Sequence, residues 1–320
     1  MTAPVLDRTT TTRPAKPGAN PSGSSPFETS RRRMVGPFLA PALLVYTLVM
    51  VVPSVFTVWI SFNDWAGAGP MEWAGLANYQ EMLRDPVFGQ SFANTMKILF
   101  GVGGAVFLIS FVLTMLLQDM FGRKFVRAVV FFPSLVPGLV IAILWGFMLD
   151  PDGLANSVLR SLGVEEPPLW LAPENMFATV MGGLAWLAAG TYTVIFMAAA
   201  DRIPRSFYEA AELDGASAMR RFWHITLPLM WDVIGVCAVL WAIGALKTFE
   251  FVLVFAGATG SLPPTSLWTF SVYAYAGAFP SDGIPRYGMA SAAAVLTMLL
   301  TVVLTLLVRR VMGRREQVDY

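Results

Sequence analysis

Long apolar runs separated by short polar connections occupy most of the chain. A helix needs about 20 residues to cross a hydrocarbon layer about 30 Å thick. Six runs reach this length, near residues 35–60, 93–118, 126–149, 176–200, 231–256 and 288–310. The pattern therefore predicts an all-α membrane protein with six transmembrane helices.

Residues 1–30 have a different pattern, because they are rich in Thr, Pro, Ser and Gly and lack apolar periodicity. Such a segment buries too little surface to offset the entropy lost on ordering. We expect a disordered cytoplasmic tail over 1–30, a transmembrane domain over 31–315, and a cytoplasmic end over 316–320.

The basic residues predict how the spans are oriented. Most of the 22 Lys and Arg residues lie before the first run, in the connections after the second and fourth runs, and after the sixth. Cytoplasmic flanks of membrane helices carry the excess of Lys and Arg. Both termini are therefore expected in the cytoplasm, and the connection between spans 4 and 5 on the same side.

Composition excludes several classes of function. The hydrophobic share is 56%, the charged share 13% and the net charge +1, which exclude a soluble domain and a basic nucleic-acid surface. One Cys and one His leave no disulfide framework and no Cys/His metal site within the chain. There is no phosphate-binding loop and no nucleophile with a base, so we expect a non-catalytic chain that binds no cofactor or metal.

The connection between spans 4 and 5 has the pattern of two short helices. Ser206 and Glu209 have the spacing of a capping box, and Gly215 is suited to the left-handed residue that ends a helix. A second helix is expected from about Ser217 to His224, before Pro228. Isolated helices this short are unstable in water, so the pair must pack against a partner protein or lie on the membrane surface.

Several motifs resemble the carbohydrate-uptake permeases of bacterial ABC importers. Glu209-Ala210-Ala211, followed by Gly215 and by Ile225 to Pro228, resembles their EAA loop. The resemblance continues through 75–79, 132–137 and 247–250, and covers about residues 35–315. It implies that this loop is a coupling helix pair, whose contacts with an ATPase subunit involve Glu209, Ala210, Ala211, Asp214, Gly215, Ile225, Leu227 and Pro228.

The resemblance also implies a function and partners. The chain would be the permease subunit of an importer in the bacterial cytoplasmic membrane, moving a disaccharide or short oligosaccharide by alternating access. Its partners would be a second homologous permease, two ATPase subunits that hold ATP and Mg²⁺, and an extracytoplasmic solute-binding protein. A polyol-phosphate importer of the same family and a secondary transporter remain as alternatives.

Five polar or aromatic residues within or beside the spans are candidates for the solute pathway. Ionisable residues within a span are costly and mark functional sites by default, whereas aromatic rings suit stacking on sugars. Each also has a structural interpretation, as a helix-bracing ion pair, an interfacial ring or a helix-to-helix hydrogen bond. The candidates are Asn94, Tyr192, Trp241 and the pair Lys247 and Glu250, expected one turn apart on one helix.

Overall fold

The computed structural model describes residues 37–118, 120–256, 262–281 and 283–312. The predicted tail over 1–30 and end over 316–320 lie outside these ranges. The chain divides into two compact units, residues 1–54 and 55–320. In the first unit the chain is helical from Pro37 and includes a π-helical turn, η1 (Thr47–Val51), before α2 (Val52–Ile60).

Four predicted spans are continuous helices, each long and apolar enough to cross a membrane. They are Pro37–Ile60, Pro86–Leu117, α9 (Pro173–Ala200) and α16 (Tyr287–Met312). The second of these consists of α4 (Pro86–Met96), a π-helical segment η2 (Lys97–Val102) and α5 (Gly103–Leu117). The chain is thus a multi-pass membrane protein.

The third predicted span is bent by 94° between Arg123–Leu135 and Gly138–Met148. It comprises α6 (Arg123–Phe131), the 3₁₀ turn η3 (Phe132–Leu135) and α7 (Gly138–Met148). Val136, with ψ of 134°, lies immediately before Pro137, and a residue before proline is disfavoured in the helical region. The sequence therefore interrupts the helix where the bend occurs.

The fifth predicted span, 231–256, is not one helix. α13 (Trp231–Leu246) ends before Lys247, and a separate α14 (Glu250–Ala256) follows. The broken segment is held by Thr269, whose hydroxyl donates to the Thr248 carbonyl at 2.8 Å, and by Ser271, which donates to the Leu246 carbonyl at 3.0 Å. These bonds satisfy backbone acceptors that an uninterrupted helix would pair internally.

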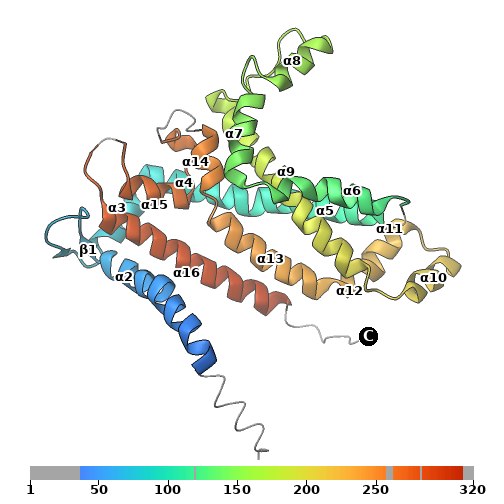
Figure 1. Ribbon diagram of the computed structural model, residues 1–320, viewed down its shortest axis with the longest axis horizontal. Helices are drawn as coiled ribbons and strands as arrows, with labels where there is room; N and C mark the ends of the chain where they lie inside the picture. The colour runs from blue at the N-terminus through green and yellow to red at the C-terminus, as the bar shows by residue number, and fades with distance from the viewer. Residues whose placement is uncertain (1–36, 119, 257–261, 282, 313–320) are drawn as a thin grey trace, which may run out of the picture. The chain divides into compact units, whose positions relative to one another are not determined.

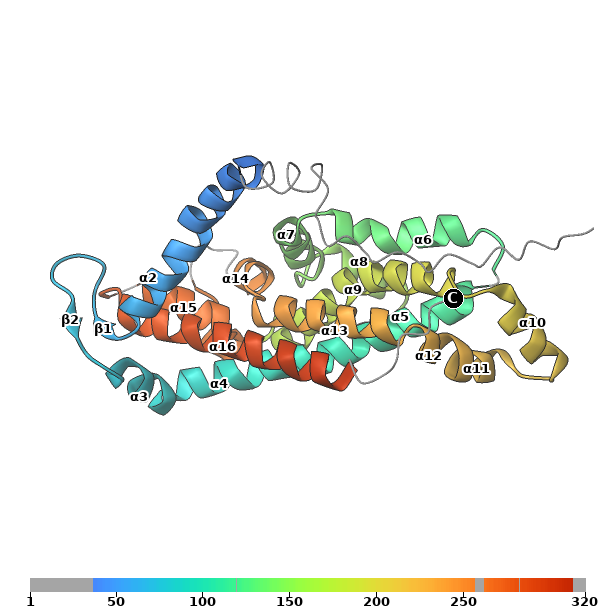
Figure 2. The ribbon, with the colours of Figure 1, turned by 90° about the horizontal axis from the view of Figure 1, so that it is seen from below.

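Within residues 55–320, α5 and α9 lie side by side, and α13 runs alongside α16 (Figures 1 and 2). Ser110 of α5 donates to the Ala189 carbonyl of α9 at 3.1 Å. The largest buried cluster gathers side chains from these helices around Phe196, Val106 and Met230. The helical core thus joins residues far apart in sequence.

Short elements cover one end of this unit. They are β1 (Asn63–Asp64), β2 (Glu72–Trp73), α3 (Ala77–Arg84), η5 (Thr265–Leu267) and α15 (Phe270–Ala278), while α8 (Leu154–Ser161) follows α7. β1 and β2 are antiparallel, with Asn63 opposite Trp73. The Asn78 amide fixes the hairpin by donating to the carbonyls of Ser61 at 3.0 Å and Asn63 at 2.9 Å.

The opposite end carries the connection between α9 and α13 (Figure 1). It contains α10 (Arg205–Leu213), α11 (Ala218–Arg221), the π-helical η4 (Phe222–Thr226) and α12 (Leu227–Leu229). The segment Ala218–Leu229 meets α13 at a bend of 73°. A pair of short helices therefore leads directly into the fifth span.

Candidate functional site

The first helix of the pair, α10, begins without the expected capping box. Its N-cap is Pro204, with φ of −57° and ψ of 135°, and no side-chain cap bond forms. Because the backbone of Pro204 already has the extended conformation of an N-cap residue, the helix begins at Arg205. Ser206 therefore lies inside the first turn. The predicted bond between Ser206 and Glu209 is thus wrong, and the Glu209 carboxylate is not needed for capping.

The end of α10 confirms the role expected of Gly215, which has a positive φ of 75°. Its amide donates to the Glu212 carbonyl at 3.0 Å, and the next amide, of Ala216, donates to the Ala211 carbonyl at 2.9 Å. These two bonds form a Schellman motif, which favours glycine at this position. A Cβ at Gly215 would meet nothing within 4 Å, so the conformation, not space, requires glycine.

The second helix begins as predicted but ends later. The Ser217 hydroxyl accepts from the Arg220 amide at 3.4 Å at its start. The chain then remains helical through η4 and α12 to Leu229, past Pro228. The π turn η4 changes the hydrogen-bond register just before the proline, where an α-helix would need the missing amide.

Two side-chain contacts fasten the two helices of the pair together. Glu212 of α10 forms an ion pair with Arg221 of α11. The Tyr208 hydroxyl lies 3.0 Å from the Thr226 hydroxyl of η4, and Thr226 is completely buried. The pair is therefore one unit joined to the base of α13.

The predicted coupling residues lie together on this pair and differ in exposure. Glu209, Ala210, Asp214, Gly215 and Pro228 are exposed, while Ala211, Ile225 and Leu227 are half-buried. Large apolar side chains accompany them, with exposed fractions of 43% for Phe207, 90% for Leu213 and 56% for Trp223. The pair thus presents an accessible surface of mixed acidic and apolar chemistry.

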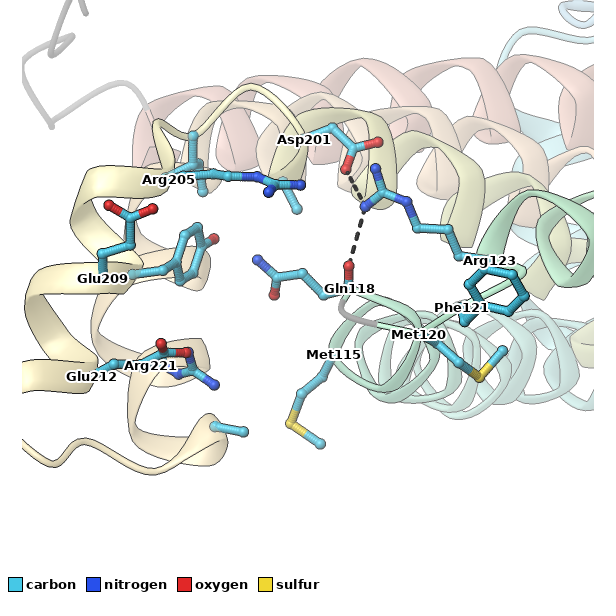
Figure 3. A pocket seen from close by; sticks show the side chains of 14 residues that line it. Met115, Gln118, Met120, Phe121, Arg123, Asp201, Arg205, Glu209, Glu212 and Arg221 are labelled. Carbon is cyan, nitrogen blue, oxygen red and sulfur yellow. Dashed lines mark hydrogen bonds and ion pairs between the residues drawn. The ribbon is translucent and has the colours of Figure 1, made fainter.

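A cavity of about 730 Å³ separates α10 and α11 from the turn between α5 and α6 (Figure 3). Arg123 lines it and bonds to Asp201 at 3.1 Å and to the Gln118 carbonyl at the same distance. Figure 3 shows the Arg205 and Gln118 side chains extending into the space. The helix pair is thus joined to the spans through α9 on one side and through α12 and α13 on the other, with this cavity beside it.

Three of the pathway candidates are engaged in packing. The buried Asn94 amide donates to the carbonyls of Ser266 at 2.7 Å and Trp268 at 3.0 Å. Tyr192 and Trp241 lie in the largest core cluster with ring centroids 6.1 Å apart. In this conformation the Asn94 amide and the rings of Tyr192 and Trp241 are thus engaged in contacts with other elements of the fold.

Lys247 and Glu250 are both exposed, but they do not stand on one helix as predicted. The helix break at residues 247–249 separates them, and no ion pair joins them in the described part of the chain. Their place in the solute pathway stays a prediction.

The second span begins earlier than the apolar run predicts, and Lys97 lies inside its helix, Pro86–Leu117. Its ammonium is 5.3 Å from the centre of the Phe177 ring. The missed signal is Asp85-Pro86, because the Asp85 carboxylate accepts from the Val87 amide at 2.9 Å and proline suits the first turn. The helix therefore begins seven residues before the predicted start of the apolar run at 93.

Residues 117–317 match the model of the "Binding-protein-dependent transport system inner membrane component". The sulfoquinovosyl glycerol transport system permease protein SmoG of Agrobacterium fabrum is 32% identical over 287 residues, covering 87% of this chain and 90% of that protein. The trehalose/maltose transport system permease protein MalF of Thermococcus litoralis is 31% identical over 279 residues, covering 85% and 91%.

A solved structure shares the fold. The bacterial ABC transporter involved in importing the acidic polysaccharide alginate contains a chain that matches with a TM-score of 0.76 and 21% identity, over 90% of this chain and 98% of that one. The family match covers more than half of the residues and most of the spans described above. This chain therefore belongs to the family of binding-protein-dependent transport system inner membrane components.

Proposed function

We propose that this chain is a permease subunit of an ATP-driven importer that moves a disaccharide or short oligosaccharide by alternating access. The names of relatives support a sugar, because two of them serve sulfoquinovosyl glycerol and trehalose or maltose. The family name supports dependence on a solute-binding protein. Membership of this family is incompatible with the secondary-transporter alternative.

The proposed assembly contains a second homologous permease, two ATPase subunits and an extracytoplasmic solute-binding protein. ATP and Mg²⁺ are held by the ATPases, and this chain binds no cofactor. We place the chain in the bacterial cytoplasmic membrane with both termini in the cytoplasm. This orientation is supported by basic residues of α6, α10 and α11, which gather at one end of the unit 55–320, as expected of a cytoplasmic end. Arg123 forms an ion pair with Asp201 there, and Arg123, Arg205 and Arg221 line the same cavity.

One observation carries the proposal: α10 and α11 form a fastened helix pair whose outer surface is exposed. Neither helix has the length needed for stability alone, yet Phe207, Leu213 and Trp223 remain accessible. An ATPase subunit that covers this surface would bury those side chains and meet Glu209. The bend of 73° then gives the pair leverage on the fifth span, because α12 continues into α13 at Met230.

The test is recovery of partners when the tagged chain is purified in detergent from its native membrane, with wild type compared with Gly215→Trp. We expect wild type to bring down an ATPase subunit and a second permease. The variant should lose the ATPase and keep the permease, because a bulky side chain then projects from the surface of the pair.

Gly163→Trp is the matched control, since Gly163 also has a positive φ, 92°, and open space around its Cβ. It ends α8 with the same two bonds, from its amide to the Arg160 carbonyl and from the Val164 amide to the Leu159 carbonyl, both 3.0 Å. The backbone strain of the two variants is thus equivalent. Equal loss of the ATPase from both variants, or a wild-type chain recovered alone, would contradict the proposal.

A further inference from the structure

The π-helical segment η2 leaves one backbone carbonyl of the second span open to a partner from another helix. In a regular α-helix the Gly103 amide would donate to the Leu99 carbonyl, four residues before it. Here the Gly103 amide donates instead to the carbonyls of Ile98 and Phe100. The wider turn therefore releases the Leu99 carbonyl from that bond.

Trp241 of α13 binds to the released carbonyl. Its indole Nε1 donates to the Leu99 carbonyl oxygen at 2.8 Å, across 142 residues of sequence. Leu99 and the surrounding core residues are buried, so few water molecules compete for the acceptor. A bond in such surroundings is stronger than one exposed to water.

Gly103 makes room for this contact. A Cβ built at Gly103 would overlap the Trp241 indole, reaching 2.9 Å from Cδ1 and 3.0 Å from Cε2. The neighbouring Gly104 has no atom within 4 Å of the same position. Glycine is thus required at Gly103, the residue whose amide does not donate to the Leu99 carbonyl, and not at its neighbour Gly104.

We propose that Leu99, Gly103 and Trp241 form a joint that positions the fifth span against the second during transport. The Leu99 carbonyl has two alternative donors, the Trp241 indole and the Gly103 amide. With the indole bound, α13 is fixed to the helix Pro86–Leu117. With the amide bound, η2 becomes regular helix and α13 is free to shift. The joint is a discrete two-state element of the kind that transmits a movement.

The position of the joint connects it to the helix pair. α13 continues from α12, so a displacement of α10 and α11 acts on Trp241 through ten residues of helix. The ring of Tyr192, in α9, packs against the Trp241 indole. The centre of the Tyr192 ring also lies 5.4 Å from the centre of the Phe107 ring. Trp241 is thereby a positioning residue, not a solute-stacking one. The link between Trp241 and ATP rests on the function proposed above, whereas the existence of the joint does not depend on that function.

The single cysteine of the chain reports directly on this joint. Cys237 is 1% exposed and lies one helical turn before Trp241 in α13. Release of α13 should expose its thiol, so the rate of alkylation by N-ethylmaleimide measures opening. The assay uses the full-length chain in its assembly, purified from native membranes, and identifies the labelled chain by mass.

We expect Trp241→Phe to raise the alkylation rate of Cys237 about two- to tenfold, the change in equilibrium that loss of one neutral hydrogen bond brings. Trp268→Phe is the matched control, because Trp268 is also half-buried and its indole donates to the Pro263 carbonyl at the same 2.8 Å. Gly103→Ala should raise the rate as well, and Gly104→Ala should not. Equal rates in Trp241→Phe and Trp268→Phe would overturn the joint.

A second measurement separates positioning from simple packing. Addition of ATP, Mg²⁺ and vanadate should change the Cys237 alkylation rate in wild type and in Trp268→Phe. Trp241→Phe should lose this response while its ATPase subunit still co-purifies. A retained response in that variant would overturn the positioning role. Absence of any ATPase in the wild-type assembly would instead contradict the proposed function and leave the alkylation comparison intact as a test of the joint.

Discussion

At the scale of single residues, local chemistry predicted the end of α10 well and its beginning poorly. Gly215 was predictable because a left-handed residue depends on its own backbone and its nearest neighbours. The capping box was not, because Pro204 already sets the extended conformation that Ser206 would have needed. A pattern of residue types at the right spacing is thus insufficient when a neighbouring proline determines where the helix begins.

Glu209 provides the most direct residue-level prediction. It forms no ion pair in the described part of the chain, so Glu209→Gln should leave the thermal stability unchanged. Recovery of the ATPase should fall about tenfold, because a charge-assisted hydrogen bond across the interface is lost.

The measurements are a melting curve and quantitative pull-down, with Glu166→Gln as the control, since Glu166 is an exposed carboxylate in the connection after α8. A lower melting temperature with normal ATPase recovery would show that Glu209 serves the fold instead.

Tyr273 gives a pH-dependent prediction. α15 lies outside the candidate spans, and the Tyr273 hydroxyl donates to the Asp85 carboxylate at 2.7 Å. Burial first, and then this hydrogen bond, raise the pKa of Tyr273 above its ordinary value of about 10. The unfolded chain therefore loses this proton at a lower pH than the native chain does.

The resulting stabilisation is complete below about pH 10 and is lost as the pH rises further. Tyr273→Phe should cost about 1 kcal/mol of stability at neutral pH through the missing bond, and should show a shallower fall in melting temperature between about pH 9 and pH 11. Melting curves of both proteins across that range check this. Parallel curves would exclude a contribution from Tyr273 ionisation.

At the scale of helices, the existence of the spans was predictable and their breaks were not. Bilayer thickness fixes how long an apolar run must be, so the six runs were evident in the sequence. In the π segment η2 the Leu99 carbonyl accepts from Trp241, 142 residues away, and the carbonyls at the break after Leu246 accept from Thr269 and Ser271. Such partners come together only in the folded chain, so no local pattern indicates them.

The contact between α6 and α9 gives an element-level prediction. A Cβ at Gly190 would overlap the Val130 carbonyl and lie 3.0 Å from the Ser134 hydroxyl oxygen. Gly190→Val should therefore destabilise the protein by about 1–3 kcal/mol through overpacking. Gly182→Val, in the same helix with nothing within 4 Å, carries the same helix propensity and should cost much less. The comparison is of melting temperatures in one detergent, and equal losses would argue against close packing at Gly190.

At the scale of the whole molecule, the charge distribution predicted the orientation of the chain, and the resemblance to importer permeases predicted its partners. The family match over 117–317 agrees with the predicted class of transport protein. The solute pathway was the least predictable part. Asn94, Tyr192 and Trp241 have the chemistry of sugar contacts, yet each is engaged with another helix in this structure. Residue type indicates which interactions are available, whereas the packing decides which of them form.

The bent third span has a consequence for how the chain is made. Arg127 of α6 donates to the Val194 carbonyl at 3.0 Å, and Ser134 donates to the Leu187 carbonyl at 2.9 Å. The ribosome completes α6 and η3 before either acceptor exists, so neither side chain has its final partner while the third span is being inserted. The third span therefore reaches its final packing only after α9 has been synthesised.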